Sequence, residues 1–254
     1  MLDNCSNMRA NQPEQPQGMI LAMSLLYMVR HGQASFGTPN YDRLSPTGQE
    51  QSKNLARHLI DKQSKFHAVY TGNMLRHQQT AQPLVDEGGL KGLCPGDFTV
   101  NGAFDEYDAT SVWTIQIEEM IREEPSIAQE LSRLPDDREV FERLFRQAML
   151  RWVSGDQDEE KGPTWKAFSS RVAKGVKEVM ETHGEDENVI VFSSAGPVSA
   201  ALQFALDLDY AKAMELAFST LNASVTVFEF NRKHITLQGY NNVSYLEESL
   251  ITDR

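Results

Sequence analysis

Three consecutive residues near the start of the chain, Arg30, His31 and Gly32, have side-chain types that suit a phosphate site. An Arg guanidinium is a planar fork of donors that matches phosphate oxygens, and a neutral His can act as a nucleophile. The apolar residues 25–29 directly precede the trio, and a short apolar run that ends at a turn signal favours a buried strand. Because open α/β sheets bind ligands at the carboxyl ends of their strands, the sequence predicts a phosphate site with His31 as nucleophile.

Two more predicted strands end in polar residues. Residues 67–71 are followed by a Gly-Asn turn and a helix with Arg76 in its first turn, where the helix N-terminus also favours anions. Residues 189–192 form the most convincing central strand, which ends in Ser193 and Ser194 before a helix over 198–206. We therefore expect a second cation and a pair of hydroxyls at the same edge of the sheet as His31.

A carboxyl group for acid catalysis is available on a fourth loop. Glu106 follows a short strand candidate at residues 98–100, and a positioned carboxyl can give a proton to a leaving oxygen. Asp105 and Asp108 are neighbouring candidates for the same role.

The elements around these residues alternate between strand and helix. Ser45 can cap a helix that starts at Pro46, and a long amphipathic helix runs from Pro163 to His183. Two late strands, at residues 224–230 and 234–239, suit a hairpin. This order predicts an α/β fold, a three-layer sandwich with a mainly parallel central sheet.

One block interrupts the alternation. Residues 110–155 have a helical pattern divided by Pro125 and Pro135, so we expect a helical insertion over about 107–160 that caps the sheet, with its acidic run at 156–160 in a solvated loop. Residues 1–22 are rich in Asn, Gln and Pro and are predicted to form a disordered arm, which leaves 23–254 as a single domain. The polar tail at 243–254 carries no signal.

Composition excludes several classes of protein. The formal net charge of −12 argues against nucleic acid or an anionic membrane as a partner, and no apolar run is long enough to span a bilayer. Two cysteines give neither a zinc pattern nor a disulfide framework, so a cytoplasmic location is expected. The apolar residues 18–29 lack a basic flank and lead straight into Arg30, which favours a strand over a signal peptide. A homo-oligomer stays open.

The segments RHGQASFG, YDRLSPTGQEQSKNLARHL and TGNMLRHQQTA, together with Glu106, resemble the histidine phosphatase superfamily, which includes the cofactor-dependent phosphoglycerate mutases. The resemblance covers roughly residues 24–240 and implies a phosphoglycerate mutase-like fold. It implies that His31 becomes a phosphohistidine, that Arg30 and Arg76 bind phosphate, and that Glu106 protonates the leaving oxygen. It implies no cofactor and no metal.

The chain departs from the family pattern at one strand end. A Ser/Thr-His-Gly-Gly pattern is usual there, and Ser194 stands in the place of its histidine. A hydroxyl donates a hydrogen bond but carries no positive charge, and loss of one transition-state donor costs about 10²–10³ in rate. Gln33 and Ser35 are further candidates for phosphate contact beside Ser194.

Three functions follow from these residues. The first is a phosphomonoester hydrolase that acts through phospho-His31 on a small phosphorylated molecule or a phosphoprotein, with slow turnover because of Ser194. The second is a weak or inactive pseudophosphatase that binds a phosphate ligand. The third and last is a serine hydrolase with Ser194 on a nucleophile elbow and Asp207 or Asp209 and then His234 as partners, although Phe192 occupies the elbow's leading glycine position.

The other histidines are predicted to be structural or to lie on the surface. His77 follows Arg76 directly, and because neighbours on a helix differ by about 100°, we expect its side chain to point to a different side of the helix. The rest are His58, His67, His183 and His234.

Overall fold

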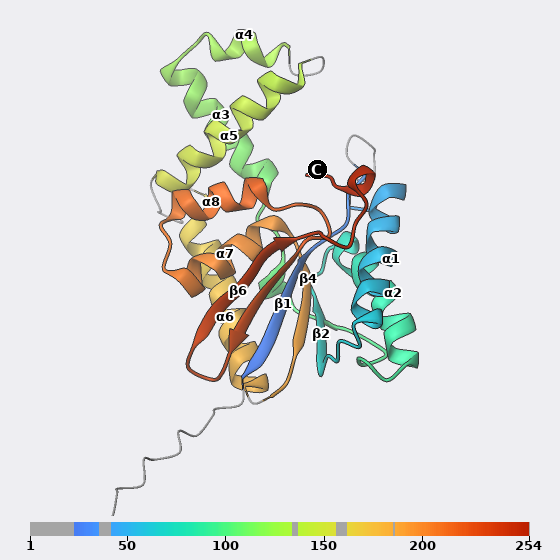
Figure 1. Ribbon diagram of the computed structural model, residues 1–254. Helices are drawn as coiled ribbons and strands as arrows, with labels where there is room; N and C mark the ends of the chain where they lie inside the picture. The colour runs from blue at the N-terminus through green and yellow to red at the C-terminus, as the bar shows by residue number, and fades with distance from the viewer. Residues whose placement is uncertain (1–22, 36–41, 134–136, 156–161, 185, 254) are drawn as a thin grey trace, which may run out of the picture.

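The structure is a computed structural model that describes residues 23–35, 42–133, 137–155, 162–184 and 186–253. Six strands form one sheet in the order β3-β2-β4-β1-β5-β6 (Figure 1). β1 pairs in parallel with β4 and antiparallel with β5, so the sheet is parallel on one side of β1 and antiparallel on the other. The strands are β1 Ser24–Arg30, β2 Ala68–Thr71, β3 Thr99–Val100, β4 Val189–Ser193, β5 Val225–Phe230 and β6 Ile235–Asn242.

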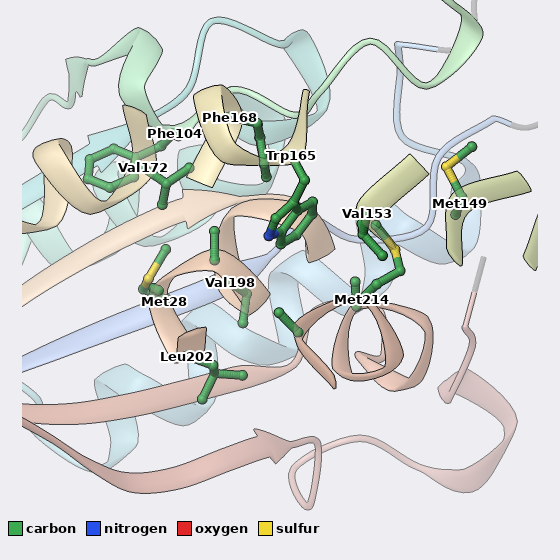
Figure 2. Packing of buried hydrophobic residues seen from close by; sticks show 14 of the residues in the cluster. Met28, Phe104, Met149, Val153, Trp165, Phe168, Val172, Val198, Leu202 and Met214 are labelled. Atoms are coloured by element: carbon green, nitrogen blue, oxygen red, sulfur yellow. The ribbon is translucent and has the colours of Figure 1, made fainter. Parts of the chain in front are cut away.

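Helices cover both faces of the sheet, because its central strands are apolar on both sides. In β1, Leu26 and Met28 contact the cluster that contains α6 (Trp165–His183) and α7 (Ala195–Leu206). Val29 faces the other way, toward α1 (Pro46–Asp61) and α2 (Leu75–Leu90). Figure 2 shows the first cluster, in which Trp165 of α6 points toward Val153 and Met214. The predicted three-layer α/β sandwich is confirmed.

The block between η1 (Gly102–Phe104) and α6 is helical. α3 spans Ala109–Glu123, α4 Ile127–Leu131 and α5 Arg138–Ser154. These helices extend beyond the end of the sheet toward which β1 runs, with α4 farthest from it (Figure 1). α5 also packs on α8 (Tyr210–Ser219), which follows α7. Pro125 lies between α3 and α4, as its helix-breaking geometry predicts.

Several predictions fall outside the described residues. They concern the arm at 1–22, Pro135, and the acidic run at 156–160. Among the residues that the structure describes, no helix is long and apolar enough to cross a bilayer.

The C-terminal tail, whose sequence predicts no structure, has a defined place in the fold. After η3 (Glu248–Leu250) it lies against the end of β1. Asn222 donates its backbone N–H to the Thr252 carbonyl at 2.9 Å, and the Gln51 side-chain amide donates to the Leu250 carbonyl at 2.7 Å. These bonds join the tail to α1 and to the segment before β5.

Candidate active site

His31 follows the last residue of β1 and is held by backbone hydrogen bonds on both sides. Its N–H donates to the Ser193 carbonyl at 2.8 Å, and its carbonyl accepts from the Ala223 N–H at 3.1 Å. The ring Nδ1 lies 2.7 Å from the Gly32 carbonyl oxygen, which can only accept a hydrogen bond. Nδ1 therefore carries the proton, and Nε2 presents its lone pair. This is the tautomer that an Nε2 nucleophile requires.

The surroundings keep this imidazole uncharged. His31 is 6% exposed, and burial together with the nearby charges of Arg76 and Arg30 holds its pKa well below the usual value of 6.5. A neutral imidazole has the free lone pair that nucleophilic attack needs.

Arg76 lies in the first turn of α2 and reaches His31 directly. Its Nε donates to His31 Nε2 at 3.2 Å, which agrees with the lone pair assigned to that atom. One of its terminal nitrogens donates to Asp42 Oδ1 at 2.7 Å. The other oxygen of Asp42 accepts from the Leu75 N–H at 2.8 Å, so this carboxylate both caps α2 and fixes Arg76. No pattern in the sequence marks Asp42 as a site residue, apart from its place in the YDRLSP segment.

Arg30 ends β1 and lies beside the C-terminal tail. Its guanidinium donates to the Thr220 carbonyl and, at 2.9 Å, to the Asp253 carbonyl. The tail therefore takes part in orienting one of the two predicted phosphate-binding arginines.

Glu106, in the loop after η1, lines one cavity together with Arg30, His31 and Arg76. Its carboxylate accepts from the Gly196 N–H at 3.1 Å and from the Tyr107 N–H at 3.0 Å. Burial raises its pKa above the usual value of 4.5, against the opposing effect of these two hydrogen bonds and of the nearby arginines. Glu106 therefore retains a proton more readily than an exposed glutamate, as a general acid should.

The two alternative acids have other contacts. Asp105 accepts hydrogen bonds from the Asn73 backbone and side chain, which fixes the turn after β2. Asp108 caps α3 by accepting from the Ser111 N–H at 3.0 Å. Of the three carboxyl groups, only Glu106 lines the cavity that contains His31.

His77 points to a different side of α2 from Arg76, as predicted, but this direction still brings its ring to the site. Its Nε2 lies 2.7 Å from Ser194 Oγ, and its ring stacks on His31 with centroids 5.8 Å apart. The ends of β1 and β4 lie side by side, so a 100° turn of α2 directs Arg76 to one and His77 to the other. Burial, with the charge of Arg76, lowers the pKa of His77 to about 3, so its ring is neutral.

Ser194 does not reach the cavity surface. It is 1% exposed, and its hydroxyl is held by His77 behind the ring of His31. The partners of the serine-hydrolase hypothesis have other places: Asp207 ends α7, Asp209 caps α8 through the Lys212 N–H, and His234 lies in the hairpin between β5 and β6. The Ser194 hydroxyl is bonded to His77 instead.

Gln33 and Ser35 also lie outside the cavity lining. The Gln33 side chain accepts a hydrogen bond from Ser45 Oγ at 2.8 Å, and the backbone N–H of Gln33 donates to Gln51 Oε1 at 2.7 Å. These bonds give Gln33 a structural role at the start of α1, and its phosphate contact stays a prediction. The Ser35 N–H donates to the Arg43 carbonyl, and phosphate contact by its side chain stays a prediction.

One cavity of about 690 Å³ connects the catalytic candidates to the cap helices. One end is polar and the other is aromatic. The polar end contains Arg30, His31, Arg76 and Glu106, and the aromatic end contains Trp113, Phe141, Phe145 and Phe218. Within the described ranges, no group of three or more His, Cys, Asp or Glu side chains could hold a metal ion.

Solved structures with the same fold come from phosphatases and hydrolases. A mutant phosphoserine phosphatase from Entamoeba histolytica, in complex with phosphoserine, has a TM-score of 0.61 at 15% identity over 88% of this chain and 100% of its own. Mycobacterial hydrolase 2 has a TM-score of 0.61 at 17% identity over 90% of this chain and 94% of its own. Mycobacterial glucosyl-3-phosphoglycerate phosphatase has a TM-score of 0.58 at 17% identity over 86% of this chain and 99% of its own.

None of the curated protein sequences matches this chain. The family model described as histidine phosphatase superfamily (branch 1) matches residues 26–142 and 137–243, which together are most of the chain. That match supports the expectation of a histidine-type phosphatase, and the arrangement of His31, Arg30, Arg76 and Glu106 agrees with it. The chain belongs to the histidine phosphatase superfamily.

Proposed function

We propose that the chain is a phosphomonoester hydrolase in which His31 Nε2 attacks the phosphorus atom of a small phosphorylated substrate. The observation that carries the proposal is the state of His31: its Nε2 holds a lone pair, lies 3.2 Å from Arg76 Nε, and lines a cavity shared with Arg30 and Glu106. A neutral nucleophile between two cations is suited to a phosphate ester, whose negative charge they offset.

The reaction proceeds in two displacements. His31 Nε2 forms a bond to phosphorus as the ester P–O bond breaks, and Glu106 gives its proton to the departing alcohol oxygen. A water molecule then attacks the phosphorus atom of the phosphohistidine while Glu106, now a carboxylate, takes a proton from that water. This step breaks the N–P bond and releases phosphate. Arg30 and Arg76 bind the phosphoryl oxygens in both steps.

His77 and Ser194 act behind the nucleophile. Both are neutral, and the His77 ring stacks on the His31 ring at 5.8 Å. In this proposal the pair positions His31 and takes the structural place of the missing second histidine. The positive charge of that histidine is not replaced, which favours slow turnover.

Replacing His31 tests the proposal. His31→Ala is expected to lower kcat for a generic aryl phosphate by at least about 10³-fold, as loss of a nucleophile does. His234→Ala, in the exposed hairpin, is the matched control and should retain full turnover. An acid-labile phosphoryl group trapped on the wild type, and absent from His31→Ala, would identify the intermediate. Equal turnover by His31→Ala and the wild type would refute the proposal.

A pseudophosphatase is the second candidate, because both arginines already contact groups of the chain itself. Arg76 is paired with Asp42, and Arg30 donates to the Asp253 carbonyl. Under this alternative, inorganic phosphate binds with dependence on both arginines while no ester is hydrolysed. His31-dependent release of phosphate from any ester would exclude it.

A further inference from the structure

The aromatic end of the cavity is built by three helices that meet above the phosphate end. Trp113 comes from α3, Phe141 and Phe145 from α5, and Phe218 from α8. The rings form one continuous wall: Trp113 and Phe145 stack with centroids 6.0 Å apart, Phe141 and Phe145 with centroids 5.7 Å apart, and the Phe145 and Phe218 centroids lie 6.5 Å apart.

These rings are not fully buried in the core. All four are partly exposed and line the cavity, whereas the core aromatics Phe104, Trp165 and Phe228 are fully buried. Apolar surface left open in a cavity is characteristic of a ligand site, because a folded protein gains stability by covering such surface elsewhere. These rings and His31 line the same cavity, so a single ligand of sufficient length can contact both.

The charged side chains at the aromatic end of the cavity are of both signs. The Arg146 guanidinium lies 4.9 Å from the Phe218 ring centroid and 3.8 Å from Glu215. Glu142, one turn before Arg146 on α5, also lines the cavity. Glu142 is itself paired with Arg138 at 2.7 Å, so a second anionic group on a substrate would meet one cation, Arg146, that already lies beside Glu215. The wall therefore favours an uncharged leaving group.

We propose that this wall binds the alcohol part of the substrate, and that the chain acts on phosphate monoesters of aromatic or similarly bulky apolar alcohols. The inference rests on the proposed phosphatase function, which it extends by naming the substrate class. A cavity of about 690 Å³ lies in the range of sites for drug-sized ligands, so phosphate alone fills only part of it. The alcohol group lies against Trp113 and Phe145 while the phosphoryl group faces His31.

A pair of esters with matched leaving groups tests the proposal. Ethyl phosphate and 2-phenylethyl phosphate both release a primary alcohol and differ in the ring. The wild type is expected to have a kcat/KM at least about tenfold higher for 2-phenylethyl phosphate, since even one missing methylene in an apolar pocket changes this ratio by about tenfold or more. Trp113→Ala and Phe145→Ala should each narrow the preference. Equal kcat/KM for the two esters would overturn the inference.

Phe204→Ala is the matched control. Phe204 on α7 is also partly exposed, but it lies beneath Lys177 and outside the cavity lining. It should keep the preference of the wild type. The unfolding midpoint of each variant shows whether a lost preference comes from the missing ring or from a destabilised fold.

Binding of non-hydrolysable phosphonates separates this inference from the proposed function. 2-Phenylethylphosphonate should bind at least about tenfold more tightly than ethylphosphonate by calorimetry, with or without turnover, because burial of a ring stabilises the complex. If neither ester is hydrolysed but the aromatic phosphonate binds more tightly, the proposed phosphatase function is refuted and ligand binding by the aromatic wall is supported. If both esters are hydrolysed equally and both phosphonates bind equally, the proposed role of the aromatic wall is refuted and the proposed phosphatase function is retained.

Discussion

His77 and Ser194, the hydrogen-bonded pair behind His31, can be replaced singly and together to test whether they share one space. His77 Nε2 and Ser194 Oγ are 2.7 Å apart, and neither residue is more than 1% exposed. Ser194→His puts an imidazole where the family pattern has one, but His77 already fills the adjoining space. The single variants, Ser194→His and His77→Ala, should therefore each be destabilised, and the double variant should recover part of the loss.

The magnitudes follow from burial. His77→Ala removes a ring from a fully buried position, which costs about 2–5 kcal/mol, and it leaves the Ser194 hydroxyl unpaired at about 1–3 kcal/mol more. Ser194→His overpacks the same site at about 1–3 kcal/mol. In the double variant the new ring occupies the vacated volume, so the pair should be coupled by at least about 1 kcal/mol in the stabilising direction.

Urea unfolding of the wild type and the three variants measures this coupling. His77→Ala should also lower kcat by up to about 10²-fold, because His31 loses the ring on which it stacks, and the double variant should recover part of that loss. If the two single free energies add to within about 0.5 kcal/mol, the two side chains do not share the space that we assign to them, and the reasoning fails.

Other predictions concern the general acid Glu106, the nucleophile His31 and the phosphate-binding Arg76. Activity should rise with pH as His31 loses its proton at its lowered pKa and fall as Glu106 loses its proton at its raised pKa, so a pH profile of Glu106→Gln should lack the falling limb. Gly196→Ala would bring a Cβ against Glu106 Oε1, so its kcat should fall more for ethyl phosphate than for p-nitrophenyl phosphate, whose leaving group needs no acid. Asp42→Asn keeps the α2 cap but removes the charge beside Arg76, so the inhibition constant of inorganic phosphate should fall by about 2–5-fold; a rise would show that the carboxylate is needed to position Arg76.

The parts of the site that follow a strand in sequence could be predicted. The run that precedes His31 is apolar on both sides of the strand, and the parallel partner β4 has the same pattern, so the ends of both strands had to meet at one edge. Arg76 could be predicted for a related reason, because it lies in the first turn of the helix that follows β2.

The missed residues depend on packing between distant segments. His77 faces the site only because β4 lies between β1 and β2, and no local pattern encodes that strand order. Asp253 reaches Arg30 because the tail returns to the sheet through Gln51 and Asn222. Phe145 and Trp113 fit an ordinary helical core stripe, and periodicity alone does not tell a buried ring from one that lines a cavity.

The position of β1 in the sheet has a consequence for how the protein is made. Leu26 pairs with Val189 and Val29 with Val225, so both neighbours of the strand that leads to His31 are synthesised long after it. Until they arrive, an apolar strand has two unpaired edges, which is a state prone to aggregation. The nucleophile therefore takes its final place late in folding. Substitutions that delay the docking of β4 or β5 should reduce the yield of folded protein before they change the chemistry of the molecules that do fold.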